Sequence, residues 1–261
     1  EVGNMYSVKI NNGISLSAVS IQGKREQQQD FYIYRQLRDR TIAIVCDGMG
    51  GLQGGNIASR KAAEILVKDL ENVDPGRDMY RFFRYEMEKL DDAIYNLRNA
   101  DGSRLGGGTT VVAILLIGSQ LYWFSVGDSK LYYARQQELY CVTRAHNYAL
   151  CLEEKRRKHE ISDEDYNREA VKGEQLISYL GMGMTELYDG NYSPFPVQQG
   201  DRLLLCTDGL YRSVPAEEIA SIMRQRGSTD RICKMFENAI TAKNRSNQDN
   251  ATWIVLQKVG D

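Results

Sequence analysis

The chain lacks several features by which common protein classes are recognised. Its five cysteines form no CxxC pair and it has only two histidines, which argues against a disulfide framework, a zinc knuckle and a cysteine nucleophile. Reduced thiols favour a cytoplasmic location. No apolar run approaches the roughly 20 residues of a membrane helix. Residues 1–4 carry neither a basic region nor an apolar core, so no signal peptide is expected.

Proline and net charge are also scarce. There are four prolines, three of them between Pro194 and Pro215, and no repeat or low-complexity linker. The 261 residues are therefore expected to form one domain, 1–261. The net charge is -2 with both signs dispersed, so bulk charge indicates neither nucleic acid nor a membrane as partner. A monomer is expected.

Hydrophobic periodicity predicts a mixed order of strands and helices. Apolar residues at helical spacing predict helices over 56–70, 77–99, 215–226 and 229–243. Short apolar or alternating runs predict strands over 14–22, 31–37, 40–46, 109–117, 121–126, 130–135, 138–142, 186–197, 202–207 and 251–258. The close spacing of the middle strands favours an antiparallel meander over βαβ units. The charged stretch 147–175 is expected to be a partly helical surface insert. The pattern predicts an α+β layered domain.

Four aspartates stand beside these predicted strands. Asp47, Asp128 and Asp208 follow apolar runs, and Asp249 precedes the last one. Carboxylates at several strand ends that meet at one rim would make an oxygen-only site, suited to hard cations such as Mg²⁺ or Mn²⁺. Bound cations would relieve the repulsion between them. Two such ions can activate a bridging water for in-line attack, typically at phosphorus, and no protein nucleophile is then required.

The glycines after the first aspartate strengthen this interpretation. An Asp-Gly turn alone is common, but the run 47–51 reads DGMGG, and several glycines permit close backbone approach to a ligand. A phosphate-binding loop is the rival interpretation. The lysine and Ser/Thr of the GxxxxGK[ST] motif are missing, which disfavours a nucleotide site.

The ordered motifs resemble those of the metal-dependent type 2C protein phosphatases, and they cover nearly the whole chain. They are Gly23–Asp30 (GKREQQQD), Val45–Gly51 (VCDGMGG), Gly108–Thr110 (GTT), Val126–Tyr132 (VGDSKLY), Leu180–Gly181, Cys206–Leu210 (CTDGL) and Gln248–Thr252 (QDNAT). Each motif alone is weak, whereas all of them in this order are specific. Met49 inside the second motif and Gln29 in the first resemble the bacterial branch of the family.

The resemblance implies a four-layer α/β/β/α sandwich with two central antiparallel sheets flanked by helices. It implies hydrolysis of phosphoserine and phosphothreonine in proteins, opposing a Ser/Thr kinase, by a water that bridges two Mn²⁺ or Mg²⁺ ions. The insert 147–175 would be the flap beside the active site.

The resemblance also gives roles to single residues. Asp47 would bridge both ions, the Gly48 carbonyl would hold one, and Asp208 and Asp249 the other. Asp128 with Asp208 matches the place of a third, weaker ion in many members. The remaining two implied site residues are Arg25, which would bind the substrate phosphate, and Asp30, which would orient metal-bound water.

Structural alternatives exist for several of these residues. Arg25 could be a surface arginine, Asp30 could cap a turn, and Asp128 could stabilise its own turn. Met49 stands where some members carry a histidine proposed as general acid, so protonation of the leaving group would fall to metal-bound water. Ala145 replaces an aspartate that often precedes the counterpart of His146, which we interpret as structural or flap-related. Other functions consistent with the chain are a non-catalytic phosphoprotein scaffold and a hydrolase of small phosphoesters or nucleotides. A sensor or effector role, in which a partner regulates the same catalytic domain through the flap, is a third.

Overall fold

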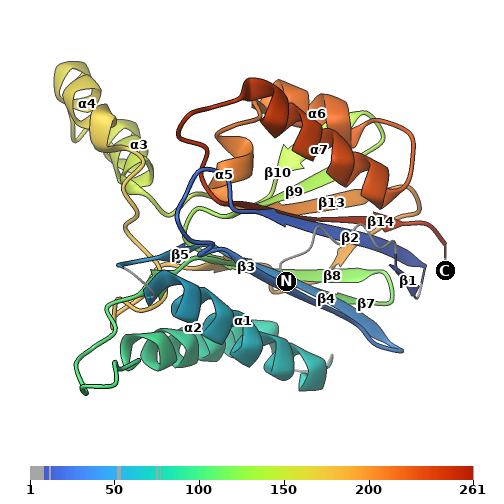
Figure 1. Ribbon diagram of the computed structural model, residues 1–261, viewed down its shortest axis with the longest axis horizontal. Helices are drawn as coiled ribbons and strands as arrows, with labels where there is room; N and C mark the ends of the chain where they lie inside the picture. The colour runs from blue at the N-terminus through green and yellow to red at the C-terminus, as the bar shows by residue number, and fades with distance from the viewer. Residues whose placement is uncertain (1–8, 12, 52–53, 75, 77, 261) are drawn as a thin grey trace.

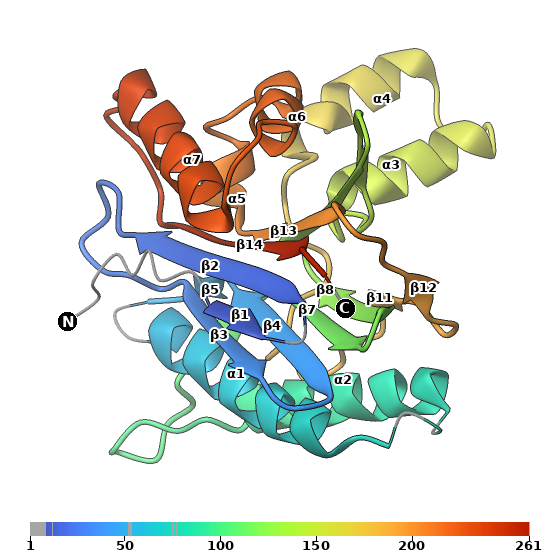
Figure 2. The same ribbon diagram turned by 90° about the vertical axis from the view of Figure 1, so that its right-hand side faces the viewer.

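Two antiparallel sheets lie face to face between two layers of helices (Figures 1 and 2). The computed structural model describes residues 9–11, 13–51, 54–74, 76 and 78–260. The stretch 1–4, in which no signal peptide is expected, and residues 52–53 after the DGMGG run lie outside the described residues. The predicted α/β/β/α architecture is confirmed.

All strand pairings among the described residues are antiparallel. Sheet A has the order β1 (Lys9–Asn11), β2 (Ile14–Ile21), β14 (Ala251–Lys258), β13 (Arg202–Cys206), β9 (Lys130–Arg135), β10 (Glu138–Cys141). Sheet B has the order β11 (Asp189–Gly190), β8 (Gln120–Val126), β7 (Val111–Ile117), β4 (Arg40–Cys46), β3 (Phe31–Gln36), with β12 (Phe195–Pro196) also on β8. A small ribbon joins β5 (Gly48–Met49) to β6 (Gly108–Thr109).

The helices divide into two layers and a projection. Helices α1 (Gly54–Asn72) and α2 (Met79–Tyr95) cover sheet B, and α5 (Asp208–Tyr211), α6 (Ala216–Met223) and α7 (Thr229–Lys243) cover sheet A. Helices α3 (Tyr148–Arg157) and α4 (Asp163–Glu169), followed by the short 3₁₀ helix η1 (Ala170–Lys172), stand away from the sandwich (Figure 1). These three helices lie inside 147–175, which we call the flap. No helix in the described part of the chain has the length and apolar character to cross a membrane.

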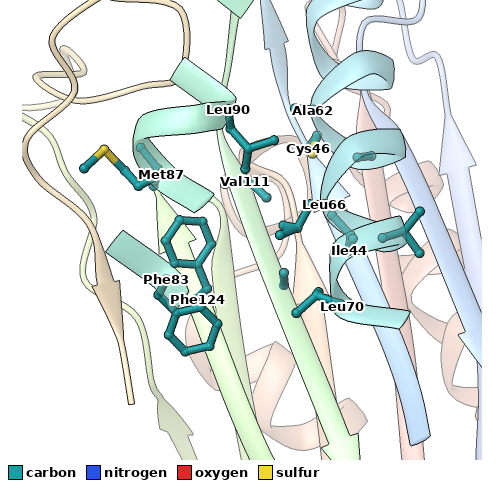
Figure 3. Packing of buried hydrophobic residues seen from close by; sticks show 14 of the residues in the cluster. Ile44, Cys46, Ala62, Leu66, Leu70, Phe83, Met87, Leu90, Val111 and Phe124 are labelled. Carbon is teal, nitrogen blue, oxygen red and sulfur yellow. The ribbon is translucent and has the colours of Figure 1, made fainter. Parts of the chain in front are cut away.

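Three apolar layers hold the sandwich together. Alternate residues of one strand face different layers, as the period of two requires: Ile254 lies between the sheets and Val255 under α7. Between sheet B and its helices, Leu66 of α1 and Leu90 of α2 are fully buried (Figure 3). Phe83 stacks on Phe124 with ring centroids 5.4 Å apart, a contact worth about 0.5–1.5 kcal/mol beyond burial.

The cysteines add no covalent links to this core. All five are free thiols, and Cys46 and Cys206 are fully buried, as their apolar surroundings in the sequence predict. Burial raises the pKa of both thiols above the ordinary value. A thiol that stays protonated is a poor nucleophile, so Cys46 and Cys206 are structural residues of the core.

Two predictions about the strands are wrong. The predicted meander is antiparallel, but it is divided: β7 and β8 belong to sheet B, whereas β9 and β10 belong to sheet A. The chain crosses between the sheets at Gly127, whose φ is +97°, a value that favours glycine. The strand predicted over 186–197 is only β11 and β12, because Asn191 leaves the ladder and its side chain accepts from the Trp123 backbone N–H at 2.7 Å.

Candidate active site

The four strand-end aspartates come together where the two sheets meet. Asp47 follows β4 of sheet B, Asp208 follows β13 of sheet A, Asp249 precedes β14, and Asp128 lies in the crossing from β8 to β9. A cleft of about 730 Å³ opens there. Its walls include the following predicted site residues: Arg25, Asp47, Gly48, Asp128, Asp208 and Asp249. The sequence separates these residues by up to 224 positions, and the fold places them in one cleft.

Asp47 is held by its backbone, which leaves its carboxylate for the cleft. Its N–H donates to the Thr110 hydroxyl at 3.1 Å, and its carbonyl accepts from the Thr110 N–H at 2.9 Å and the Thr109 hydroxyl at 2.9 Å. Both threonines are fully buried. They therefore fix the end of β4.

Glycines beside two of the aspartates are required by close packing of the backbone. A Cβ at Gly48 would lie 2.2 Å from the Gly55 carbonyl oxygen, and one at Gly209 would lie 1.8 Å from the Asn250 carbonyl oxygen. Neither neighbour can move without displacing the main chain. Gly209 therefore allows the segment after Asp208 to approach the segment that carries Asp249, and Gly48 allows the segment after Asp47 to approach the start of α1.

The aspartates carry more negative charge than their surroundings compensate. Burial raises the pKa of Asp47 well above its ordinary value, and the carboxylates of Asp30, Asp208 and Asp128 raise it further. Burial also raises the pKa of Asp208 and of Asp128. Oxygen donors that repel one another in this way are the ligands that Mg²⁺ and Mn²⁺ prefer. The donor set therefore fits divalent cations of this class.

Two arginines pair with the acids of the cleft. Arg25 Nη2 lies 2.6 Å from Asp249 Oδ2, and Arg212 Nε lies 2.9 Å from Asp208 Oδ2. Among the described residues, no three acidic, histidine or cysteine side chains converge closely enough to hold an ion by themselves. An ion would therefore take ligands such as the Gly48 carbonyl and water as well, and Arg25 would leave Asp249.

Asp30 is the predicted site residue that does not line the cleft. It is buried beneath Asp208, where it accepts a hydrogen bond from the Thr207 hydroxyl at 2.8 Å. Burial raises the pKa of Asp30 to about 7, and the charges of Asp208 and Asp249 act in the same direction, against the Thr207 hydrogen bond. Its connection to the cleft runs through Thr207, the residue before Asp208.

Asn250 is a positioning residue to which the sequence analysis gave no role. Its Oδ1 accepts from the Gln29 N–H at 2.9 Å, and its Nδ2 donates to the carbonyls of Gln22 at 2.8 Å and Gln27 at 3.0 Å. The side chain thereby fastens the loop that carries Arg25. The sequence feature that could have indicated this role is the position of Asn250 next to Asp249.

His146 is fully buried and does not line the cleft. Its Nδ1 accepts from the Gly127 N–H at 3.1 Å, so its Nε2 carries the proton that faces Asp189 Oδ2 at 3.1 Å. Arg144 binds the same carboxylate at 2.6 and 2.9 Å. Asp189 thus provides the acidic partner that Ala145 cannot.

A family model described as protein phosphatase 2C matches residues 20–249. The chain belongs to the protein phosphatase 2C family. The family predicted from the motifs is confirmed, and with it the prediction that the chain is a phosphatase enzyme.

Bacterial relatives resemble this type 2C phosphatase over most of their length. The serine/threonine phosphatase stp of Listeria welshimeri is 28% identical over 229 residues, 87% of this chain and 88% of that one. Protein phosphatase PhpP of Streptococcus pneumoniae is 28% identical over 209 residues, 77% of this chain and 80% of that one.

Solved structures share the fold of this type 2C phosphatase. The serine/threonine phosphatase of S. agalactiae superposes with a TM-score of 0.77 at 24% identity, covering 95% of this chain and 100% of that one. A PstP catalytic domain in complex with two manganese ions has a TM-score of 0.72 at 23% identity, covering 95% and 99%.

Proposed function

We propose that this chain hydrolyses phosphoserine and phosphothreonine in proteins with the help of two Mn²⁺ or Mg²⁺ ions. The observation that carries the proposal is the meeting of Asp47, Asp208 and Asp249 in one cleft with Arg25 at its edge. Asp47 and the Gly48 carbonyl would hold one ion, and Asp47 with Asp208 and Asp249 the other. When bound, the ions would supply a water nucleophile and neutralise charge on the phosphate.

Arg25 is placed to bind the substrate phosphate. Its side chain is 60% exposed and reaches over the cleft to Asp249. A guanidinium offers a planar pair of donors that match two phosphate oxygens. A phosphate that enters the cleft can take over these donors, because the exposed pair with Asp249 is worth little. Arg25 would then orient the phosphate and stabilise charge on its oxygens.

Asp30 and Met49 shape the proton chemistry of the cleft. Asp30 is hydrogen bonded to Thr207 and would orient water at Asp208 through that contact. Met49 lines the cleft and has no proton to donate. Protonation of the leaving serine or threonine oxygen would therefore come from water.

The wider setting of the enzyme is part of the proposal. We propose a single catalytic domain over 1–261 with the flap at 147–175, acting as a monomer on phosphoproteins made by a Ser/Thr kinase. The free thiols support a cytoplasmic location.

Phosphopeptide hydrolysis tests the proposed function. The enzyme is stripped with EDTA and assayed with and without added Mn²⁺, beside Asp47→Asn and, as a control, Asp92→Asn on the exposed face of α2. We expect Mn²⁺ to restore the rate of the wild type and of Asp92→Asn, but not of Asp47→Asn. Activity that survives complete chelation, or an Asp47→Asn variant at the wild-type rate, would refute the proposal.

A further inference from the structure

Arg212 lies where three carboxylates meet at the rim of the cleft. Its Nε is 2.9 Å from Asp208 Oδ2, its Nη1 is 2.8 Å from Glu174 Oε2, and its Nη2 is 3.8 Å from Asp128 Oδ2. It is the C-cap residue directly after α5, which begins with Asp208, so the two residues stand at i and i+4. Its backbone N–H donates to the Asp208 carbonyl at 2.9 Å. The guanidinium is therefore fixed beside one of the proposed ligands.

Asp128 depends on this guanidinium for its charge. Its side chain is 5% exposed, and a buried carboxylate is costly unless a cation or hydrogen-bond donors face it. Tyr211 donates a hydroxyl to Asp128 Oδ2 at 3.2 Å. Of the described residues, Arg212 is the one cation within ion-pair distance of the Asp128 carboxylate. Among the described residues, Arg212 is also the one cation within ion-pair distance of the Asp208 carboxylate. One guanidinium therefore compensates the charge of both acids.

We propose that Arg212 is a built-in counter-cation for Asp128 and Asp208 and takes the place that a third divalent ion would occupy between them. This inference rests on the proposed two-ion function and changes the expectation of a third ion at the same pair of acids. It assigns Arg212 a charge-compensating role that its position in the sequence alone does not reveal.

The chemistry of arginine suits this role. A guanidinium remains protonated at every pH at which the protein is folded, and its five donors can serve several acids in one plane. Because it is attached to the chain beside Asp208, its charge is present at any ion concentration. A divalent ion that approached the same two acids would be repelled by the guanidinium and would have to displace it.

The contact with Glu174 extends this charge to the flap. Glu174 lies two residues after η1, at the end of the flap. Its side chain is 77% exposed, so the ion pair is weak. Glu174 therefore links the flap to Arg212 without being needed for compensation of Asp128, and a Glu174→Gln variant should leave the number of bound ions unchanged.

The experiment counts Mn²⁺ ions per chain by equilibrium dialysis and elemental analysis. It compares the wild type with Arg212→Met, which removes the charge and keeps the length, and with Arg212→Lys, which keeps a charge. Arg224→Met is the matched control, since Arg224 is also a C-cap residue, directly after α6, and does not line the cleft. Circular dichroism confirms that each variant is folded.

We expect Arg212→Met to bind one more ion than the wild type, and the added Asp128→Asn substitution to remove that ion. Arg212→Lys and Arg224→Met should bind as many ions as the wild type. The wild-type count of two tests the proposed function, whereas the difference between variants tests this inference. Equal counts for Arg212→Met and the wild type would overturn it.

Two further results would overturn the inference without relying on the Arg212→Met variant. A wild-type ion that disappears in Asp128→Asn would overturn the inference, because the acid pair would then already hold a metal. An extra ion in Arg212→Lys would also overturn it, because the charge would not be what excludes the ion.

Discussion

Replacing Asp91 with alanine should destabilise the protein strongly, although Asp91 lies outside the cleft. Its carboxylate is buried on α2 and accepts four hydrogen bonds from the loop that follows the flap. The donors are the N–H groups of Gly181 at 2.6 Å, Gly183 at 3.3 Å and Thr185 at 3.1 Å, and the Thr185 hydroxyl at 2.8 Å. Alanine would leave the three backbone N–H groups without a partner, on a main chain that cannot turn away, whereas the Thr185 hydroxyl could still donate to the Tyr179 carbonyl at 2.7 Å.

The size of the effect follows from these contacts. A hydrogen bond to a charged group contributes about 1.5–3 kcal/mol, and four bonds to one carboxylate are far from additive. We therefore expect the free energy of unfolding to fall by about 3–4 kcal/mol. With a urea dependence of about 3 kcal/mol per molar, the unfolding midpoint would fall by about 1 M.

Urea unfolding followed by tryptophan fluorescence measures this change, because Trp253 is fully buried. Asp92→Ala is the matched control: it is the next residue on α2, its side chain is exposed, and it should change the free energy by no more than about 0.5 kcal/mol. A loss below about 1 kcal/mol for Asp91→Ala would show that the loop finds other acceptors, and the reasoning would be wrong.

Three further predictions concern the cleft and its supports. Arg25→Ala should lower kcat/KM for a phosphopeptide by about 10- to 100-fold, mainly because KM rises, and Arg25→Lys should recover part of this loss. An unchanged KM would contradict the proposal that Arg25 binds the phosphate. Gly209→Ala should lower the free energy of unfolding by about 3 kcal/mol in thermal melts, whereas Gly51→Ala, with open space around its Cβ, should not. Burial would raise the pKa of Asp189, but His146 and Arg144 hold it below the ordinary value. The ionised Asp189 therefore stabilises the fold above about pH 4, and this stabilisation is lost as the pH falls below that value. Asp189→Asn should make the free energy of unfolding depend less steeply on pH in this acid range. An equally steep pH dependence in the variant and the wild type would refute this.

The regular elements were predictable where one apolar face repeats. The helix predicted over 229–243 and the strand predicted over 251–258 have the observed bounds of α7 and β14. The prediction of a strand over 186–197 failed because Asn191 leaves the ladder between β11 and β12, and short apolar runs do not reveal such interruptions. The division of the four middle strands between two sheets depends on the turn at Gly127, which pairing rules alone do not give.

The site was predictable in its acids and less so in their partners. Strand ends are rigid and lie at the edge of a sheet, so Asp47, Asp208 and Asp249 could be identified from position. The contacts of Arg212 could not, because Glu174 and Asp128 reach it from distant parts of the chain. The pairing of His146 with Asp189 was hidden in the same way. The roles of these residues in catalysis stay predictions until they are measured.

Because the chain crosses between the two sheets, the cleft is sensitive to substitutions in the protein interior. The acids of the cleft stand on opposite sheets, so their separation is set by the thickness of the apolar filling between the sheets, about 10 Å in packed sheets. Leu205 and Ile254 of sheet A and Val45 of sheet B belong to that filling. A substitution that removes one methyl group from this interior can alter the spacing of the acids, although every side chain that lines the cleft is unchanged.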